Sequence, residues 1–394
     1  MSISAKSPAI PSPAFPAPAG GLVTPESRRP GRPQPLPKHR LLSLDAFRGF
    51  VIASMLLVNN MIYNDATPRQ LMHAPWGGGV TFTDMILPWF VFAMGVAVSL
   101  GSATAPDTRN AGSLSPLRVL RRVLVLVGLG VALTSIEAWR LTAGMGVLQL
   151  LGLSYAVGVA LGSTPIWVRL AAAGMLLEGY GDLLVVVSVP GYGTDVLLQQ
   201  HNVIRYLNGT YLARFDLAGA LSVVPAGAVA LLGTVAGGVL CSWRLRPFAK
   251  AAVLLAGGAA LIAGSLAWVH VLPISKDLWT PSYVLLSAGT GWLLLGSFYL
   301  VFDVARLRAP GIPFAVFGAN AIVAYVVPIL FMEVLKHFYI PAGGAVVSMQ
   351  VALLHALQHR LGTIGTMWAY TGGIILVWWI VLLDLYRRRI FIRV

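Results

Sequence analysis

Apolar runs of about 20 residues recur along this chain, and they constrain its fold more than any other feature of the sequence. A run of that length can cross a membrane as a helix, because each backbone N–H and C=O is then bonded within the segment. Hydrophobic residues make up 57% of the 394 positions and charged residues only 11%, whereas a soluble domain has about 25% charged residues. We therefore expect an all-α, polytopic membrane helical bundle.

We expect about ten transmembrane helices, and they lie near residues 44–63, 81–101, 117–138, 146–162, 166–188, 215–241, 248–272, 282–303, 313–334 and 365–386. Of the 28 lysines and arginines, 20 fall in segments that this count places inside, seven outside, and Arg48 within a span. Cytoplasmic segments carry such an excess. It predicts a multi-pass protein of the cell inner (plasma) membrane with both termini cytoplasmic. Because it also accounts for the net charge of +14, we expect no nucleic-acid partner.

The two ends of the predicted bundle differ in composition. Residues 1–38 are rich in Pro, Ala and Gly, which predicts a disordered cytoplasmic tail before a transmembrane domain over residues 39–394. Residues 343–358 are too short to span, and they predict an outer interfacial or re-entrant helix. His355 and His359 have a metal-compatible spacing without an HExxH pattern, and Cys241 is the single cysteine. We expect no metal.

Polar residues interrupt the first two spans. Asp45, Arg48 and Asn59 share one face of the first helix at about 100° per residue, and Asp84 lies near the start of the second. A charge at the bilayer centre costs about 2.5–3.5 kcal/mol on insertion scales, so such residues mark functional paths. A structural reading stays open, with an ion pair between Asp45 and Arg48 and a helix-start role for Asp84. It leaves unexplained why these residues flank a histidine, His73.

Several segments, in order, resemble the heparan-α-glucosaminide N-acetyltransferase family, which consists of transmembrane acyltransferases with many bacterial members. They are SLDAFRGFVIASMLLVNN (43–60), HAPWGG (73–78), TFTDMILPWFVFAMG (81–95), GVLQLLGLSY (146–155), FDLAGALSVVPAGAVALLGTVAG (215–237), LPISKDLWTPSYVL (272–285) and FGANAIVAYV (317–326). One position departs from the family pattern. Leu150 stands where the family usually has a cation after GVLQ, which removes any role of that cation toward coenzyme A.

The resemblance implies transfer of an acetyl group from cytosolic acetyl-CoA to an amino sugar or other glycan acceptor on the extracytoplasmic side. The family's catalytic histidine corresponds to His73, and its asparagine to Asn59 or to Asn60. A histidine suits proton transfer near neutral pH, or it accepts the acetyl group as a nucleophile. Asp84 would orient the imidazole, and Asn59 would stabilise the oxyanion.

Further residues are expected to bind the donor or the acceptor. Arg48, near the cytoplasmic mouth, is placed to meet phosphates or to be held by Asp45. Lys276 and Trp279 belong to the outer segment, where the tryptophan would stack on a sugar. Two intramembrane amides complete the set, although each is also the kind of residue that bonds helix to helix: Gln149 and Asn320.

Two other classes of protein stay open. A transporter or flippase of the cell envelope would also carry ionisable residues inside the membrane, and an envelope scaffold would need no chemistry. Transport would survive the loss of His73, whereas acetyl transfer would not. The sequence also leaves a homodimer in the lipid bilayer open.

Overall fold

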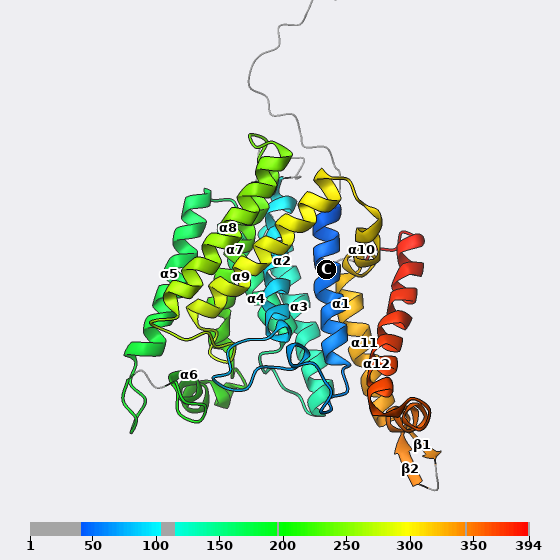
Figure 1. Ribbon diagram of the computed structural model, residues 1–394. Helices are drawn as coiled ribbons and strands as arrows, with labels where there is room; N and C mark the ends of the chain where they lie inside the picture. The colour runs from blue at the N-terminus through cyan, green and yellow to red at the C-terminus, as the bar shows by residue number, and fades with distance from the viewer. Residues whose placement is uncertain (1–40, 104–114, 195–196, 343–344, 393–394) are drawn as a thin grey trace, which may run out of the picture. The chain divides into compact units, whose positions relative to one another are not determined.

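The computed structural model describes residues 41–103, 115–194, 197–342 and 345–392, and these form a helical bundle (Figure 1). The predicted tail at residues 1–38 lies outside the described residues. The helices are α1 (Leu42–Asn59), α2 (Phe82–Ala103), α3 (Pro116–Ala138), α4 (Val147–Gly162), α5 (Ile166–Val186), α6 (Val203–Leu207), α7 (Val223–Cys241), α8 (Pro247–Trp268), α9 (Pro281–Phe298), α10 (Ile312–Ala319), α11 (Ala321–His337) and α12 (Met349–Arg387). The all-α class is therefore confirmed.

Seven of the described helices are long and apolar enough to cross a membrane, and the bent pair α10–α11 would make an eighth. Each of the ten predicted spans contains a helix, although α4 has only 16 residues. Proline at the first helical position begins α3, α8 and α9, where its missing N–H costs nothing. The protein is a multi-pass membrane protein, and the number of ten spans stays a prediction.

The centre of the bundle is built on α2 and α7. In the most apolar 18-residue stretch of each helix, 78% of α2 and 83% of α7 are buried, whereas only 17% of α3 is buried. Glycines let the two backbones touch, because a Cβ at Gly95 would collide with the carbonyl of Ala230, and one at Gly233 with that of Phe92. Close approach through small residues is the usual way in which membrane helices pack. Helices α2 and α7 therefore form the closely packed centre of the bundle.

A second close contact joins α1 to α10. A Cβ at Gly49 would collide with the carbonyl of Phe314, and one at Gly318 with that of Asp45. Directly after this contact the chain turns by 67° at Asn320, between α10 and α11. The predicted span near 313–334 therefore contains two helices, since Asn320 has non-helical φ and ψ of −123° and 53°.

The prediction of a helix over 343–358 is correct only for its second part. Two strands, β1 (Tyr339–Ala342) and β2 (Ala345–Ser348), pair antiparallel with Tyr339 opposite Ser348. Their β-branched and aromatic residues favour this pairing. Helix α12 then begins at Met349, capped by the Ser348 side chain, and it is kinked at Gly362, where φ is 67°.

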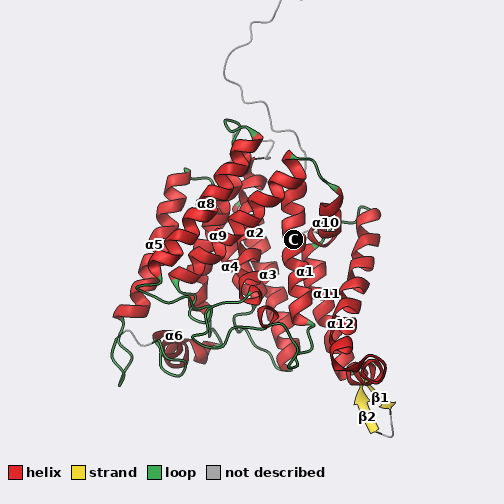
Figure 2. Cartoon of the chain, viewed as in Figure 1, coloured by secondary structure: helices red, strands yellow, loops and turns green. Residues whose placement is uncertain are grey.

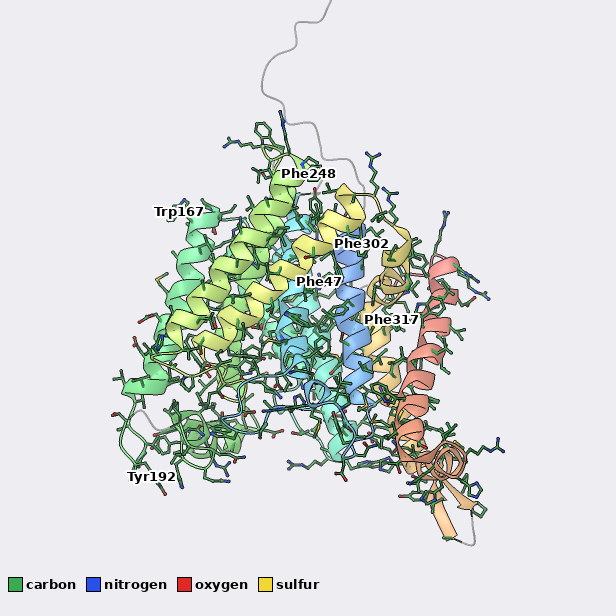
Figure 3. All side chains as sticks on the ribbon, viewed as in Figure 1. Phe47, Trp167, Tyr192, Phe248, Phe302 and Phe317 are labelled. Carbon is green, nitrogen blue, oxygen red and sulfur yellow. The ribbon has the colours of Figure 1, made fainter. Side chains whose placement is uncertain are left out.

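Most of the longer loops gather at one end of the bundle, together with α6 and the β1–β2 hairpin (Figure 2). The predicted outer segments lie at this end, and the helix termini next to the predicted inner segments lie at the other (Figure 1). Aromatic residues mark both ends (Figure 3): Trp167 and Phe248 are 71% and 70% exposed, and Tyr192 is 52% exposed. Exposed rings near both ends are typical of membrane interfaces, whereas Phe47 is fully buried.

Candidate active site

His73 lies in the connector between α1 and α2, and its ring meets the first turn of α2. The Nδ1 atom of His73 is 2.7 Å from Oδ1 of Asp84. The connector turns back toward α2 at Gly77 and Gly79, whose φ values of 73° and 77° suit glycine. Two residues expected to act together are thus in contact, and the ring is held at the mouth of the bundle.

The carboxylate of Asp84 has a side chain that is 0% exposed, yet it is surrounded by donors. Its Oδ2 accepts the backbone N–H of Ala74 at 3.1 Å, and the backbone N–H and hydroxyl of Thr81, each at 3.0 Å. The Tyr283 hydroxyl donates to the main-chain oxygen of Asp84 at 2.5 Å. A buried carboxylate is stable only with such partners. This side chain is fixed in place from several directions.

The role of Thr81 was missed in the sequence, although a signal for it exists. Thr81 precedes α2 and Asp84 follows three residues later, which is the spacing of a capping box at a helix start. In that motif the acidic side chain reaches back to the backbone N–H of the capping residue, as it does here. The same carboxylate therefore begins α2 and holds His73.

Lys276, which lies 203 residues after His73 in the sequence, is the third member of the group that His73 and Asp84 form. Its Nζ is 3.3 Å from Oδ1 of Asp84 and 2.9 Å from Nδ1 of His73. Nδ1 cannot donate to Oδ1 and accept from Lys276 at the same time. The tautomer with its proton on Nδ1 satisfies the shorter of the two contacts, 2.7 Å to Oδ1, and leaves the lone pair on the other ring nitrogen, Nε2. The His73 side chain is 58% exposed, so this nitrogen is open to a reactant.

Lys276 is positioned by a tight loop between α8 and α9. The hydroxyl of Thr280 bonds to the carbonyl of Pro273 at 2.9 Å and accepts the N–H of Ser275 at 3.0 Å. Trp279, in the left-handed region with φ of 51°, is only 7% exposed and packs edge-on against Tyr283. The Trp279 ring therefore supports the Lys276 loop from within, and the expected stacking of Trp279 on a sugar stays a prediction.

The two asparagines at the end of α1 face different surroundings. Asn60 is buried, its Nδ2 donates to Leu56 at 2.9 Å, and its main-chain oxygen accepts from Thr371 at 3.2 Å. Asn59 is exposed. Both line a cavity of about 280 Å³ that His73 does not line, and no hydrogen bond among the described residues joins Asn59 to His73 or Asp84. The structure therefore does not bring Asn59 into the His73 group.

The remaining predicted residues lie elsewhere. Asp45, 8% exposed, and the half-buried Arg48 lie in the first turns of α1, at the opposite end of that helix from Asn59. Gln149 is buried in α4 and its Nε2 donates to Gly144 at 3.0 Å. Both ends of the Asn320 amide are used, because Nδ2 donates to Ile390 and Oδ1 accepts from Ile392, each at 2.9 Å. This pairing runs against a ligand-binding role for Asn320.

Asp216, in the FDLAG segment, holds the α3–α4 loop. Its carboxylate accepts the Thr142 hydroxyl at 2.5 Å and the backbone N–H of Ala143. The hydrogen bond from Thr142 lowers the pKa of Asp216, and that from Ala143 adds to the effect. Asp216 is partly exposed, so it joins two loops at the surface, the α3–α4 loop and the segment before α7.

Known proteins match most of this chain. A family model described as heparan-alpha-glucosaminide N-acetyltransferase, catalytic, matches residues 40–262. The heparan-alpha-glucosaminide N-acetyltransferase of Mus musculus is 25% identical, covering 96% of this chain and 63% of the relative. That of Homo sapiens is 26% identical, covering 89% and 59%. This chain thus spans about three fifths of the length of these curated relatives. Because the family model covers more than half of the chain, the chain belongs to the heparan-alpha-glucosaminide N-acetyltransferase family.

Proposed function

We propose that this protein transfers an acetyl group from acetyl-CoA to an amine or hydroxyl of a glycan on the extracytoplasmic side of the cell inner membrane. Family membership supports acyl transfer. The observation that carries the proposal is the contact of an exposed histidine with a buried, donor-rich carboxylate, 2.7 Å between Nδ1 and Oδ1. A histidine held in one tautomer by a carboxylate is a general base or a nucleophile.

In the direct route, Nε2 of His73 takes a proton from the acceptor amine while the amine nitrogen attacks the thioester carbonyl. The C–S bond then breaks, and the coenzyme A thiolate leaves and takes that proton from Nε2. The other proton stays on Nδ1 throughout, and Asp84 accepts its hydrogen bond. The carboxylate thereby stabilises the imidazolium that forms between the two steps. Lys276 neutralises part of the carboxylate charge, since its Nζ lies 3.3 Å from Oδ1.

The second route uses the same atoms in another order. Nε2 attacks the thioester, coenzyme A leaves, and the acetyl-imidazole then reacts with the acceptor. Acid-quenched protein that is mixed with acetyl-CoA alone distinguishes the two routes by intact mass. A gain of one acetyl group that His73→Ala abolishes supports the covalent route, and an unchanged mass supports the direct one.

The test of the proposed function is acetyl-CoA turnover by the purified protein with amino sugars as acceptors. His73→Ala should lower turnover by about 10²–10⁴-fold, the usual contribution of a general base. The matched control is His270→Ala, because His270 is an exposed histidine just after α8. If neither variant differs from the wild type, or if the wild type neither binds nor consumes acetyl-CoA, the proposal fails. Substrate flux that persists in His73→Ala would favour a transporter.

A further inference from the structure

An apolar groove lies between α11 and the two parts of α12. The two parts, residues 349–361 and 363–387, meet at the kink at Gly362. Figure 1 shows the first part nearly along its axis, beside β1 and β2, whereas the second part runs along the bundle. We call this space, of about 430 Å³, the α12 groove. Its walls come from both parts of α12 and from α11, and they include Phe331, Leu335, Leu353, Leu357, Ile374 and Val377.

The open surface of the α12 groove is hydrocarbon. Tyr370 carries the single hydroxyl among the lining residues, and this oxygen already accepts Nε2 of Gln350 at 3.1 Å. The Nε1 atom of Trp378 is buried, and its ring packs edge-on against Phe331 with the ring centres 5.7 Å apart. Phe331 and Val377 are 43% and 53% exposed. A sugar or a nucleotide would find no hydrogen-bond partner here, whereas an acyl chain needs none.

The surface around the α12 groove faces lipid. Helix α12 is long and apolar enough to cross a membrane, and α11 belongs to the bent pair that would cross it together. Apolar side chains of α12 outside the groove are exposed as well, since Ile364 is 56% and Leu376 56% exposed. Acyl chains are therefore the molecules that reach this groove in a membrane.

Arg360 lies on the groove side of the first part of α12. It follows Leu353 by seven residues and Leu357 by three, and these spacings return to the same face of a helix. Its side chain is exposed, and it makes no ion pair or hydrogen bond with any residue that the structure describes. A long cationic side chain at the edge of an apolar surface reaches the lipid headgroups.

The charge beside the α12 groove is positive. Residues 338–383 contain no aspartate or glutamate. The nearest acidic residue on α11, Glu333, is paired with Lys336, whose Nζ is 2.6 Å from Oε1. An anionic headgroup complements this charge. A second copy of the chain does not, because a twofold interface on this face would bring two unpaired Arg360 side chains together.

We propose that the α12 groove binds one anionic phospholipid, with an acyl chain along the groove and the phosphate at Arg360. The lipid would hold both parts of α12 against α11. Helix α12 in turn contacts the connector that carries His73, because the Thr371 hydroxyl donates to the main-chain oxygen of Asn60 at 3.2 Å and the Thr67 hydroxyl contacts Sδ of Met367 at 3.5 Å. The bound lipid is thus expected to raise the melting temperature of the protein.

Native mass spectrometry of the purified full-length protein in detergent counts bound lipids directly. The probes are palmitoyl-oleoyl phosphatidylglycerol and palmitoyl-oleoyl phosphatidylcholine, which have the same chains and differ in headgroup charge. We expect one phosphatidylglycerol to bind about fivefold more tightly than phosphatidylcholine, the ratio that corresponds to about 1 kcal/mol for one arginine near an anionic lipid. Equal affinities for the two lipids would overturn the proposal.

Two neighbouring glycines of α12 give a matched pair of variants. Gly373 lines the groove and Gly372 does not, and a Cβ at either position has no atom within 4 Å. Gly373→Leu should therefore fill the groove without a collision and abolish retention of both lipids. Gly372→Leu should bind both lipids as the wild type does. Arg360→Gln should still bind lipid but lose the preference for phosphatidylglycerol, and a preference that persists would refute the role of Arg360.

A variant on the opposite wall covers the case in which Gly373→Leu does not fold. Leu353 is 44% exposed, so Leu353→Gln should fold and place an amide in the groove, which weakens binding of both lipids. Unchanged lipid binding in either folded variant would refute the groove as the site. Size-exclusion chromatography with light scattering completes the test. If Gly373→Leu dissociates a dimer while lipid binding is unchanged, the groove belongs to a second copy and the proposal fails.

Discussion

Asp84 and Glu137 are acidic residues at the same end of the bundle (Figure 1), one at the start of α2 and the other at the end of α3. The Asp84 side chain is completely buried and is bonded to His73, Ala74 and Thr81. Glu137 is exposed, borders a cavity and has no partner among the described residues. The difference shows that Asp84 is committed to positioning other groups, whereas Glu137 positions none of the described residues.

The largest effect is expected at the committed carboxylate. Asp84→Asn puts an NH₂ group where an oxygen now accepts hydrogen bonds, so it disturbs either the Thr81 contacts or the hold on His73. Turnover of acetyl-CoA should fall by at least about a hundredfold, as for carboxylates that orient a catalytic histidine. The melting temperature should also fall, because a buried donor loses its acceptor. Turnover within threefold of the wild type would mean that Asp84 does not position His73.

A smaller effect is expected at the other carboxylate. Glu137→Gln should leave the turnover of acetyl-CoA near the wild-type value, because Glu137 has no hydrogen bond or ion pair with His73, Asp84 or Lys276 among the described residues. The melting temperature should not change. Steady-state kinetics at saturating acetyl-CoA measure the turnover. A fall as large as that of Asp84→Asn would show that the two carboxylates do not differ in the way described.

Lys276 sharpens the comparison, because it contacts Asp84 without being needed to bury it. Lys276→Met should lower turnover by about threefold to tenfold, since a partly exposed charge contributes less than a buried one. Lys276→Arg, which keeps the charge, should lose less activity. Turnover of acetyl-CoA by the two variants under the same conditions tests this, and equal losses would exclude an electrostatic role.

The smallest effect concerns a third carboxylate, that of Asp216, which is hydrogen-bonded and partly exposed. Hydrogen bonds to Thr142 and Ala143 lower its pKa, so its contribution to stability is complete above the unfolded pKa and disappears as the pH falls through the folded pKa. Melting curves between about pH 3 and 7 should therefore show a steeper acid-side decline for the wild type than for Asp216→Asn. Parallel curves would contradict this linkage.

The sequence predicted the helices well because apolar runs of this length have few alternatives in a membrane. It also indicated His73 and Asp84 as partners, which lie 11 residues apart around one connector. It could not indicate the break at Asn320, because the bonds to Ile390 and Ile392 that stabilise it come from 70 residues away. Hydropathy indicates how deep in the membrane a residue lies but not which side chains cover it. The burial of Trp279 could therefore not be predicted from the sequence either.

Asn59 and Asn60 show a second limit of sequence reasoning. Neighbouring residues on a helix point about 100° apart, so Asn59 is exposed whereas Asn60 is buried and bonds back to its own helix, although both line the cavity at the end of α1. Which of the two faces a given neighbour depends on the rotation of α1 in the bundle. That rotation is set by the contact of Gly49 with Phe314, a tertiary feature with no local signal.

The tie between Asn320 and the backbone of Ile390 and Ile392 has a practical consequence for handling the protein. Cutting the chain after Arg389, by a protease or by a stop codon, would remove both partners of an amide that is otherwise fully buried. The bend between α10 and α11 would then lose the two hydrogen bonds that hold Asn320. Helix α11 carries Glu333 and Lys336. An affinity tag is therefore better appended beyond the last residue than exchanged for the final few.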